Sequence, residues 1–479
     1  MLFNSWQYAV FLPLVFILYW ALPHKYRWVL ILISSYYFYA SWNVKYLLLI
    51  IFITIVSFFG GKAISACGGN TARKKLAVAV VAGVSLSVLF VFKYLEFAVE
   101  TVRHVFACFS VTIPEFTSSL LLPVGISFYT FQAIGYIVDV YRGDIVPETH
   151  LGKYAAFISF FPQLVAGPIE RTRNLLPQLK ERRIFDYGQA TYGLKLMAWG
   201  YFKKIVIADT LAVYVDFVYR DMHNSWGFSR LTAIIFFAIQ IYCDFSGYSD
   251  IARGTAKLLG IELMENFKSP YFATSIKEFW RRWHISLSSW FRDYIYIPLG
   301  GNRCGKIRNA FNLMVTFFAS GAWHGAAWTF IAWGGGHGAL QVIENQLKDT
   351  KAADKIKIPR PVKMLVTFIL VCGLWTVFRA ESVHDAAYMC LLCFVGFDNP
   401  ASWLMGGIGN LGLTSRAIIR IILMLIILGT FDYYSQKTDV ILAISKKPLL
   451  LRWTVYLLLV VLIFVWAPAE SAEFIYFDF

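Results

Sequence analysis

Long apolar segments alternate with short polar ones along almost the whole chain. Several of them approach or exceed the roughly 20 apolar residues with which an α-helix crosses the hydrocarbon core of a bilayer. Some are shorter than a full crossing, so tilted or partly inserted helices are expected among them. The segments are residues 5–22, 76–93, 231–243, 311–333, 364–378, 417–430 and 453–467.

The period of this pattern decides between the two kinds of membrane fold. Backbone groups in lipid must be hydrogen-bonded internally, so only helices and closed barrels cross a bilayer. The segments lack the alternation over about ten residues that is typical of a barrel strand. The chain is therefore predicted to be all-α, a polytopic membrane helical bundle of about 11 to 13 helices, with re-entrant and interfacial ones included.

Two segments depart from the spanning pattern. Residues 152–168 contain Pro162 and the pair Gly167–Pro168, which favours a re-entrant segment over a spanning helix. Residues 275–296 carry aromatic and aliphatic side chains at helical spacing, with charged side chains on the other faces. This predicts an amphipathic helix at or just within the cytoplasmic interface, and an anchoring helix without chemistry remains an alternative.

Composition and charge support a membrane protein with basic loops. The 479 residues are 58% hydrophobic and 15% charged, and 44 Lys and Arg against 29 Asp and Glu give a net charge of +15. Much of the excess lies in short loops, which are expected to face the cytoplasm, with both chain ends outside. The loops are scattered and carry no nucleic-acid motif, so topology explains most of them. The aromatic tail EFIYFDF is expected either to dock a partner or to anchor at the interface.

Two short patterns are weighed and set aside. Cys390 and Cys393 form a C-x-x-C, but no second pair or His cluster accompanies them, so packing cysteines and no metal site are expected. Gly407, Gly409 and Gly412 fit G-x-G-x-x-G without a surrounding βαβ unit, so a loop between helices is the preferred interpretation.

Residues 244–308 hold a density of charged and polar side chains that cannot face lipid, because an ionised group at the bilayer centre costs several kcal/mol. These side chains must line protein, a water-filled cavity or the interface. Tyr248, Ser249, Asp250 and Arg253 either line a tunnel or form a buried network that holds helices together, and both alternatives remain open.

The segment GAWHGAAWTFIAWGGGHG, residues 321–338, places His324 and His337 in apolar surroundings. On one unbroken helix the two would lie about 20 Å apart. Gly334–Gly336 can break that helix; a kink or turn there would bring His337 closer, and the alternative is that His337 is a packing or supporting residue. Small residues beside His324 allow close approach of a backbone or ligand, and tryptophans wall a narrow channel. An imidazole with a pKa near 6.5 suits proton transfer near neutrality.

At these residues the chain resembles the membrane-bound O-acyltransferase family, in particular its bacterial branch acting on cell-envelope polymers by alginate O-acetylation or teichoic-acid D-alanylation. The resemblance spans essentially the whole chain and implies one integral-membrane domain over residues 1–479, with a catalytic core at about 120–345. It is carried by LLPVGISFYTFQAIGYIVDVYRG, FPQLVAGPIER, DFSGYSDIARG, EFWRRWHISLSSWFRDYIYIPLGGNR and GAWHGAAWTFIAWGGGHG.

The resemblance also implies roles for two histidines. The family's His in its W-H-G element matches His324, which would be the general base that deprotonates the acceptor hydroxyl. The upstream polar partner matches His284 in RRWHISLS, which would position the donor or support the charge of the intermediate. Both would approach a tunnel from the cytoplasm to the outer face. Further candidates for tunnel lining or support are His337, Trp323, Trp328, Asp250, Arg253, Trp283, Arg281 and Arg282.

The implied function is transfer of an acetyl group from cytoplasmic acetyl-CoA, with no bound cofactor, to an extracytoplasmic polysaccharide. An SGNH-type partner is expected to complete the transfer, and the implied location is the bacterial inner membrane, in contact with lipid. A D-alanyl or other acyl transferase of the same fold is an alternative. A proton-coupled transporter with a histidine relay is a further one, which the lack of two recognisable inverted repeats disfavours. Which polymer is acetylated is left open.

Overall fold

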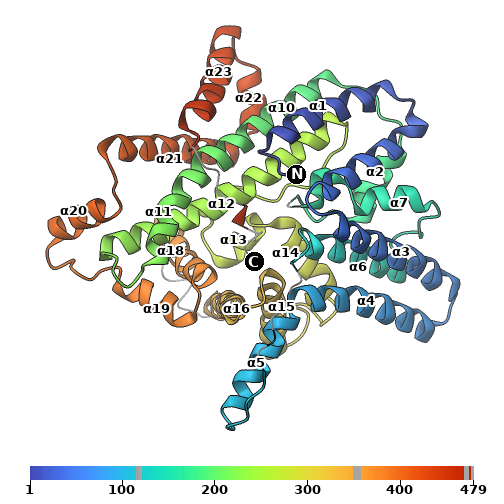
Figure 1. Ribbon diagram of the computed structural model, residues 1–479, viewed down its shortest axis with the longest axis horizontal. Coiled ribbons are helices and arrows are strands. Elements are labelled where there is room, and N and C mark those ends of the chain that lie inside the picture. Colours follow the sequence, from blue (N-terminus) through green and yellow to red (C-terminus); the bar gives the residue numbers. More distant parts are fainter. Residues whose placement is uncertain (115, 117–120, 166, 349–357, 469–473, 476–479) are drawn as a thin grey trace. The chain divides into compact units, whose positions relative to one another are not determined.

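The computed structural model describes residues 1–114, 116, 121–165, 167–348, 358–468 and 474–475. All regular structure in this part of the chain is helical (Figure 1), and six helices are long and apolar enough to cross a membrane. The predicted all-α, multi-pass membrane fold is confirmed. Helical segments are more numerous than expected, because several predicted helices are divided into short ones. The six long helices are α3 (Val44–Ala66), α4 (Thr71–Lys93), α12 (Gly227–Leu258), α18 (Arg360–Arg379), α21 (Ser415–Ser435) and α23 (Leu449–Trp466).

The chain forms two compact units. Unit 1 comprises residues 1–194 and 252–264, and unit 2 comprises residues 195–251 and 265–479. In unit 1, α3, α4 and α6 (Ile126–Arg142) pack against one another, and nearly all of α6 is buried. The other helices that begin in unit 1 are α1 (Trp6–Ala21), α2 (His24–Ala40), α5 (Leu95–Ala107), α7 (Leu151–Ile158), α8 (Phe161–Leu164), α9 (Thr172–Lys180) and α10 (Tyr187–Tyr201).

The predicted re-entrant segment contains the short helices α7 and α8. Side-chain amides join α6, α7 and α8, because Gln132 Nε2 on α6 and Gln163 Nε2 on α8 both donate to the carbonyl oxygen of Phe157 on α7, at 3.0 and 3.1 Å. Pro162 near the start of α8 prevents one continuous helix across the segment. No spanning helix forms at these residues, and a re-entrant path in the membrane stays a prediction.

Unit 2 is built around α12, α15, α16 and α18. Its short helical segments carry the polar stretch at residues 265–303, and α19 to α22 follow toward the C-terminus. Besides α12, α18, α21 and α23, the helical segments that begin in unit 2 are η1 (Phe202–Ala208), α11 (Asp209–Arg220), η2 (Pro270–Phe272), α13 (Ile276–Arg282), α14 (Ile285–Phe291), η3 (Arg292–Tyr296), α15 (Lys306–His324), α16 (Trp328–Lys348), α19 (Val383–Leu392), α20 (Pro400–Asn410) and α22 (Val440–Ser445).

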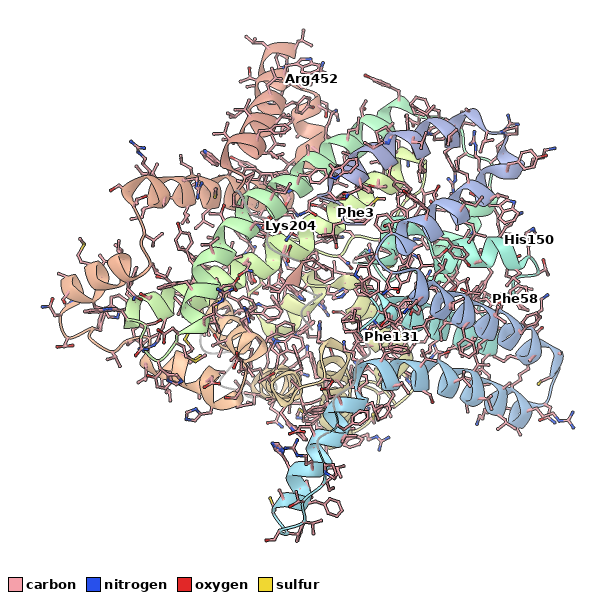
Figure 2. All side chains as sticks on the ribbon, in the orientation of Figure 1. Phe3, Phe58, Phe131, His150, Lys204 and Arg452 are labelled. Atoms are coloured by element: carbon pink, nitrogen blue, oxygen red, sulfur yellow. The ribbon has the colours of Figure 1, made fainter. Side chains whose placement is uncertain are left out.

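A buried ionic network joins η1 to α11 and α12 in unit 2 (Figure 2, Lys204). Lys204 Nζ lies 2.8 Å from a carboxylate oxygen of Asp209 and 2.8 Å from one of Asp244. The neighbouring Lys203 Nζ lies 2.7 Å from Asp250 and donates to Ser246 Oγ. Buried charges in a membrane protein are tolerated when they are paired in this way. Asp250 thus belongs to the helix-linking network that was one of its two predicted roles.

The predicted continuous helix over residues 311–333 is wrong. Helix α15 ends at His324, Gly325 has extended backbone dihedrals, and α16 begins at Trp328 and runs unbroken through Gly334–Gly336. The two helices form the most extensively packed pair in the described chain. A Cβ atom on Gly321 would lie 2.3 Å from the carbonyl oxygen of Phe330, and one on Gly334 would lie 2.4 Å from that of Phe317. These glycines therefore allow two helices to touch, and the break falls elsewhere.

The GxGxxG and C-x-x-C segments also have structural roles. Gly407 and Gly409 lie within α20 instead of the expected loop, and Gly412, at φ 61°, follows in the turn. Cys393 is buried at the end of α19, and its thiol donates to the carbonyl oxygen of Cys390. Both cysteines are free thiols.

Candidate active site

His284 lies at a break between two short helices, and the predicted amphipathic helix over residues 275–296 is therefore not continuous. Helix α13 ends at Arg282, and His284 adopts the left-handed conformation, with φ 42° and ψ 54°. Asn266 caps the next helix, because Ile285 N–H donates to its carbonyl oxygen at 3.0 Å and Ser286 N–H to its Oδ1 at 3.2 Å. A non-glycine residue at positive φ is strained by about 1–3 kcal/mol and is frequent at functional sites.

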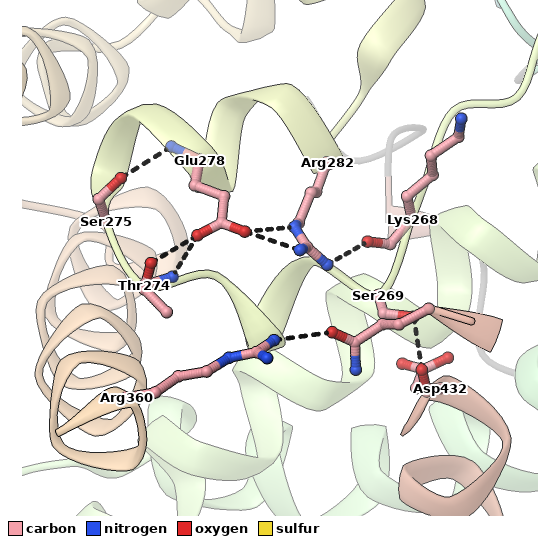
Figure 3. Close-up of polar contacts among 9 residues, drawn as sticks. Lys268, Ser269, Thr274, Ser275, Glu278, Arg282, Arg360 and Asp432 are labelled. Atoms are coloured by element: carbon pink, nitrogen blue, oxygen red, sulfur yellow. Dashed lines mark hydrogen bonds and ion pairs between the residues drawn. The ribbon is translucent and has the colours of Figure 1, made fainter. Parts of the chain in front are cut away.

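A cluster of hydrogen-bonded polar side chains stabilises α13, the helix that precedes this break (Figure 3). Ser275 caps α13 by accepting from Glu278 N–H, and Glu278 accepts from both the N–H and the hydroxyl of Thr274. Arg282 donates to the same carboxylate at 2.7 and 3.0 Å and to the carbonyl oxygen of Lys268. Burial alone would raise the pKa of Glu278, but the hydrogen bonds from Thr274 and Arg282 lower it below its usual value. Arg282 therefore stabilises α13 and joins it to the segment that contains Lys268.

The His284 imidazole is completely buried and neutral. Its ring lies 4.6 Å from that of Phe245 and 5.8 Å from that of Trp323, and neither ring nitrogen has a hydrogen-bond partner among the described residues. Burial lowers its pKa to about 3. Unsatisfied buried polar atoms are rare and cost about 1–3 kcal/mol each, so this pair of nitrogens indicates a functional position.

His324 is the last residue of α15 and is 2% exposed. Three aromatic rings pack against its imidazole, with centroid distances of 4.9 Å to Trp323, 4.9 Å to Trp333 and 5.4 Å to Phe378. Trp323 thus lies against both His284 and His324. The indole of Trp323 therefore contacts both histidines to which the family resemblance assigns roles.

His337 also packs against Trp333, whose ring is 5.0 Å from its imidazole. Trp280 Nε1–H donates to His337 Nδ1 at 3.3 Å, which assigns the proton of the neutral ring to Nε2. The buried Nε2 has no partner in the described part of the chain. Gly334–Gly336 lie inside α16 and make no break, and the antiparallel packing of α15 and α16 places His337 beside Phe317, with ring centroids 6.3 Å apart.

A cavity of about 750 Å³ lies beside this row of rings, within unit 2. Lys277, Arg281 and Arg292 are cations on its wall. Arg292 is paired with Asp293 at 2.8 Å, and the backbone N–H of Lys277 donates to a carboxylate oxygen of Glu344 at 3.2 Å. Its wall also follows one face of α15, where residues three or four apart are neighbours. Ser320, one turn before His324, is the last of these, and the others are Asn309, Leu313, Thr316 and Phe317.

Aromatic contacts connect the cavity wall to the histidines. Trp280 lines the cavity, donates to His337 and lies 5.7 Å from Trp333, which in turn touches His324. His324 itself is not a lining residue. If His324 is catalytic, a substrate in the cavity must therefore reach it past Trp280 and Trp333, along the last turn of α15.

The other predicted site residues separate into three groups. Trp283 is buried among the same rings, 4.9 Å from Trp375, and Arg281 lines the cavity. Trp328, at the start of α16, is 59% exposed and is not among the lining residues of this cavity. It starts a helix at the end of a tight turn, which carries its side chain outward. Arg253 belongs to unit 1, so the structure does not place it relative to this site.

The two described residues of the tail, Phe474 and Ile475, are buried, and docking of a partner or anchoring at the interface by the tail stays a prediction. Ile475 N–H donates to Asp244 Oδ2 at 2.8 Å, and Phe474 packs 4.2 Å from the ring of Tyr248 and 6.1 Å from that of Phe245. Aromatic burial and one buried acceptor hold these two residues inside unit 2. The rest of the motif, residues 476–479, lies outside the described residues, as does Glu473.

Sequence reasoning missed Asn266 and Lys204. Asn266 determines where α14 starts and hence how His284 is held, but an Asn in a polar loop carries no distinguishing sequence signal. Lys203 and Lys204 in the apolar run AWGYFKKIVIA did carry one, since adjacent lysines in such a run must find buried partners.

Comparison with known proteins gives consistent similarities. Residues 147–382 match the sequence profile of the membrane-bound O-acyltransferase family. The chain is 37% identical over 485 residues to a probable alginate O-acetylase of Pseudomonas putida, covering 98% of each chain. It is 40% identical over 432 residues to one of Azotobacter vinelandii, covering 89% of this chain and 84% of the relative. It is 34% identical over 392 residues to a peptidoglycan O-acetyltransferase of Helicobacter pylori, covering 74% and 71%.

Proposed function

Because this chain belongs to the membrane-bound O-acyltransferase family and is an O-acyltransferase, we propose that it transfers an acetyl group to an extracytoplasmic polysaccharide. The acetyl group and the polysaccharide acceptor are supported by the relatives, which are named as alginate O-acetylases and a peptidoglycan O-acetyltransferase. The observation that carries the proposal is that, in this member of the family, Trp323 packs against both His284 and His324. The proposed location is the bacterial inner membrane.

His324 acts as the general base in this proposal. The acceptor hydroxyl oxygen bonds to the thioester carbonyl carbon while its proton passes to the imidazole. The carbon–sulfur bond then breaks, and the proton ends on the leaving thiolate, which leaves as a thiol. A positioned acid–base group of this kind contributes about 10²- to 10⁴-fold in rate.

His284 supports the same step as a neutral hydrogen-bond donor. Its pKa of about 3 leaves it uncharged at neutral pH, and neither of its nitrogens is occupied by a described residue. One N–H is therefore available for the oxygen on which negative charge develops. A fixed donor in a dry site stabilises such an oxygen without moving a proton.

We propose acetyl-CoA as the donor, with the cavity as its approach. The phosphates of CoA are polyanionic, and Lys277, Arg281 and Arg292 place three cationic side chains on the cavity wall, of which Arg292 is paired with Asp293. Ser320 brings this wall to within one helical turn of His324. We further propose that an SGNH-type partner completes transfer to the polymer; support for this step is the resemblance to the bacterial branch alone.

The test is acetyl transfer by purified protein in lipid nanodiscs, with radiolabelled acetyl-CoA and alginate oligosaccharides, alone and with an SGNH-type partner. His324→Ala should lower transfer by at least about 100-fold. His384→Ala is the matched control, because that side chain is 83% exposed, whereas His324 is 2% exposed. Full activity of a folded His324→Ala protein would remove the proposed base.

A further inference from the structure

We propose that Phe378 and Trp333 restrict the transferred acyl group to two carbons. This inference rests on the proposed function, in which His324 is the base, and it assigns the acyl-chain selectivity of that site. The two rings come from different helices, α18 and α16, and both pack on His324, at 5.4 and 4.9 Å.

The acyl group has to lie close to these rings. A general base acts within hydrogen-bond reach of the attacking hydroxyl, about 3 Å, and that oxygen must come within about 3–3.5 Å of the carbonyl carbon. The acyl carbons attached to the carbonyl are therefore next to whatever encloses His324. Trp323, Trp333 and Phe378 enclose it, and each is less than 5% exposed.

A second layer of aromatic rings packs behind Phe378 and Trp333 and limits the room beside them. Phe330 packs edge-on against Phe378 at 4.9 Å, and Trp375 lies 5.4 Å from Phe378 and 5.7 Å from Trp333. Phe330 is itself fixed, because a Cβ on Gly325 would lie only 2.0 Å from its ring. Cores packed at this density have few voids that hold an extra methylene group.

Phe378 is the residue at which selectivity can be changed most cleanly. Trp323 also contacts His284, and Trp333 also contacts His337, so changes there disturb two histidines. Phe378 contacts His324 from α18, outside the α15–α16 pair that carries His324 and His337. Shortening it enlarges the space beside His324 and leaves the other imidazoles in place.

The experiment compares kcat/KM for acetyl-CoA, propionyl-CoA and butyryl-CoA in nanodiscs. The wild-type protein should discriminate against butyryl-CoA by at least about 10-fold, the effect of excluding a methylene from an apolar pocket. Phe378→Leu and Phe378→Ala should raise the butyryl-to-acetyl ratio by about 10-fold or more, with the larger rise in the Ala variant. Trp333→Phe should raise it in the same direction.

Phe279→Leu and Phe279→Ala are the matched controls. Phe279 is equally buried, and its ring contacts that of His337 at 6.1 Å, but it is not among the rings packed on His324. These variants should leave the butyryl-to-acetyl ratio unchanged even where total activity falls. A ratio that rises equally in the Phe279 and Phe378 variants would show general loosening and overturn the proposal.

The remaining outcomes are also decisive. Comparable wild-type rates with acetyl-CoA and butyryl-CoA contradict the proposal, as does an unchanged ratio in active Phe378→Leu protein. The Leu variant keeps most of the apolar volume, so it remains informative if Phe378→Ala fails to fold. Absence of transfer from every acyl-CoA by wild-type protein is a different result, because it overturns the proposed donor and this inference with it.

Discussion

His284 shows at the scale of one residue how backbone and side chain make separate demands. Its φ of 42° favours glycine or asparagine, whereas its position between Phe245 and Trp323 requires a ring. The family resemblance predicted the residue and its partner, His324. The cap that Asn266 provides next to His284 is a contact between residues 20 positions apart, so it leaves no local pattern in the sequence.

Replacing His284 by Gly and by Ala separates these demands. Both variants lack the imidazole, so acetyl transfer should fall by at least about tenfold in each. Glycine relieves the left-handed strain, so His284→Gly should melt at a higher temperature than His284→Ala, by the equivalent of about 1 kcal/mol. Differential scanning fluorimetry in detergent measures this difference. Equal melting temperatures would mean that the backbone at residue 284 is not strained.

Trp280→Phe tests the hydrogen bond that orients His337. The substitution keeps an aromatic ring but removes the N–H that donates to Nδ1, so the two neutral tautomers of His337 should become mixed. Nitrogen NMR of protein labelled at histidine should show one protonated and one unprotonated nitrogen for His337 before the change and averaged signals after it. A His337→Gln sample assigns the resonances, and identical spectra for the two proteins would contradict the assigned tautomer.

At the scale of elements, α15 and α16 show what a hydrophobic pattern leaves undecided. The pattern correctly predicted apolar helices near residues 311–333, yet it did not separate a glycine that ends a helix from one that lets two helices touch. Gly325 has the first role, whereas Gly321 and Gly334 have the second. The difference lies in the partner backbone, Phe317 and Phe330, which a single sequence does not reveal.

Gly334→Ala should therefore destabilise the α15–α16 pair. The added methyl would meet a backbone carbonyl at 2.4 Å, which the chain relieves only by separating the helices. Overpacking of this kind costs about 1–3 kcal/mol. Gly373→Ala on α18 is the control, since nothing described lies within 4 Å of its added Cβ, and it should melt like the wild type or slightly above. An unchanged melting temperature for Gly334→Ala would contradict the close approach.

At the scale of the whole molecule, apolar length and charge predicted the all-α membrane fold, because the bilayer imposes that solution on any such chain. The pattern of apolar and charged residues did not predict the ionic network around Lys204 or the burial of Phe474. Both depend on which helices become neighbours in unit 2, and paired charges in apolar runs indicate only that some partner exists.

Stability of the whole protein should decline in mild acid because of His284. Burial lowers its folded pKa from 6.5 to about 3, so its contribution is present above pH 6.5 and is lost as pH falls toward 3. Between pH 7 and 5 the wild-type melting temperature should therefore fall more steeply than that of His284→Asn. Glu170 acts in the opposite sense, because burial raises its pKa from 4.5 to about 7 and its contribution is lost as pH rises through that range. Parallel curves for the two proteins would contradict the neutral buried imidazole.

The indoles of Trp323 and Trp333 pack against His284, His324 and His337, so their fluorescence reports on the surroundings of these histidines. Tryptophan emission responds to the polarity and protonation of groups in contact with the ring. A thioester entering beside these rings should change their emission, and Trp333→Phe should remove most of that signal. Donor arrival can thus be timed by stopped-flow fluorescence on unlabelled protein, apart from the chemistry that follows it.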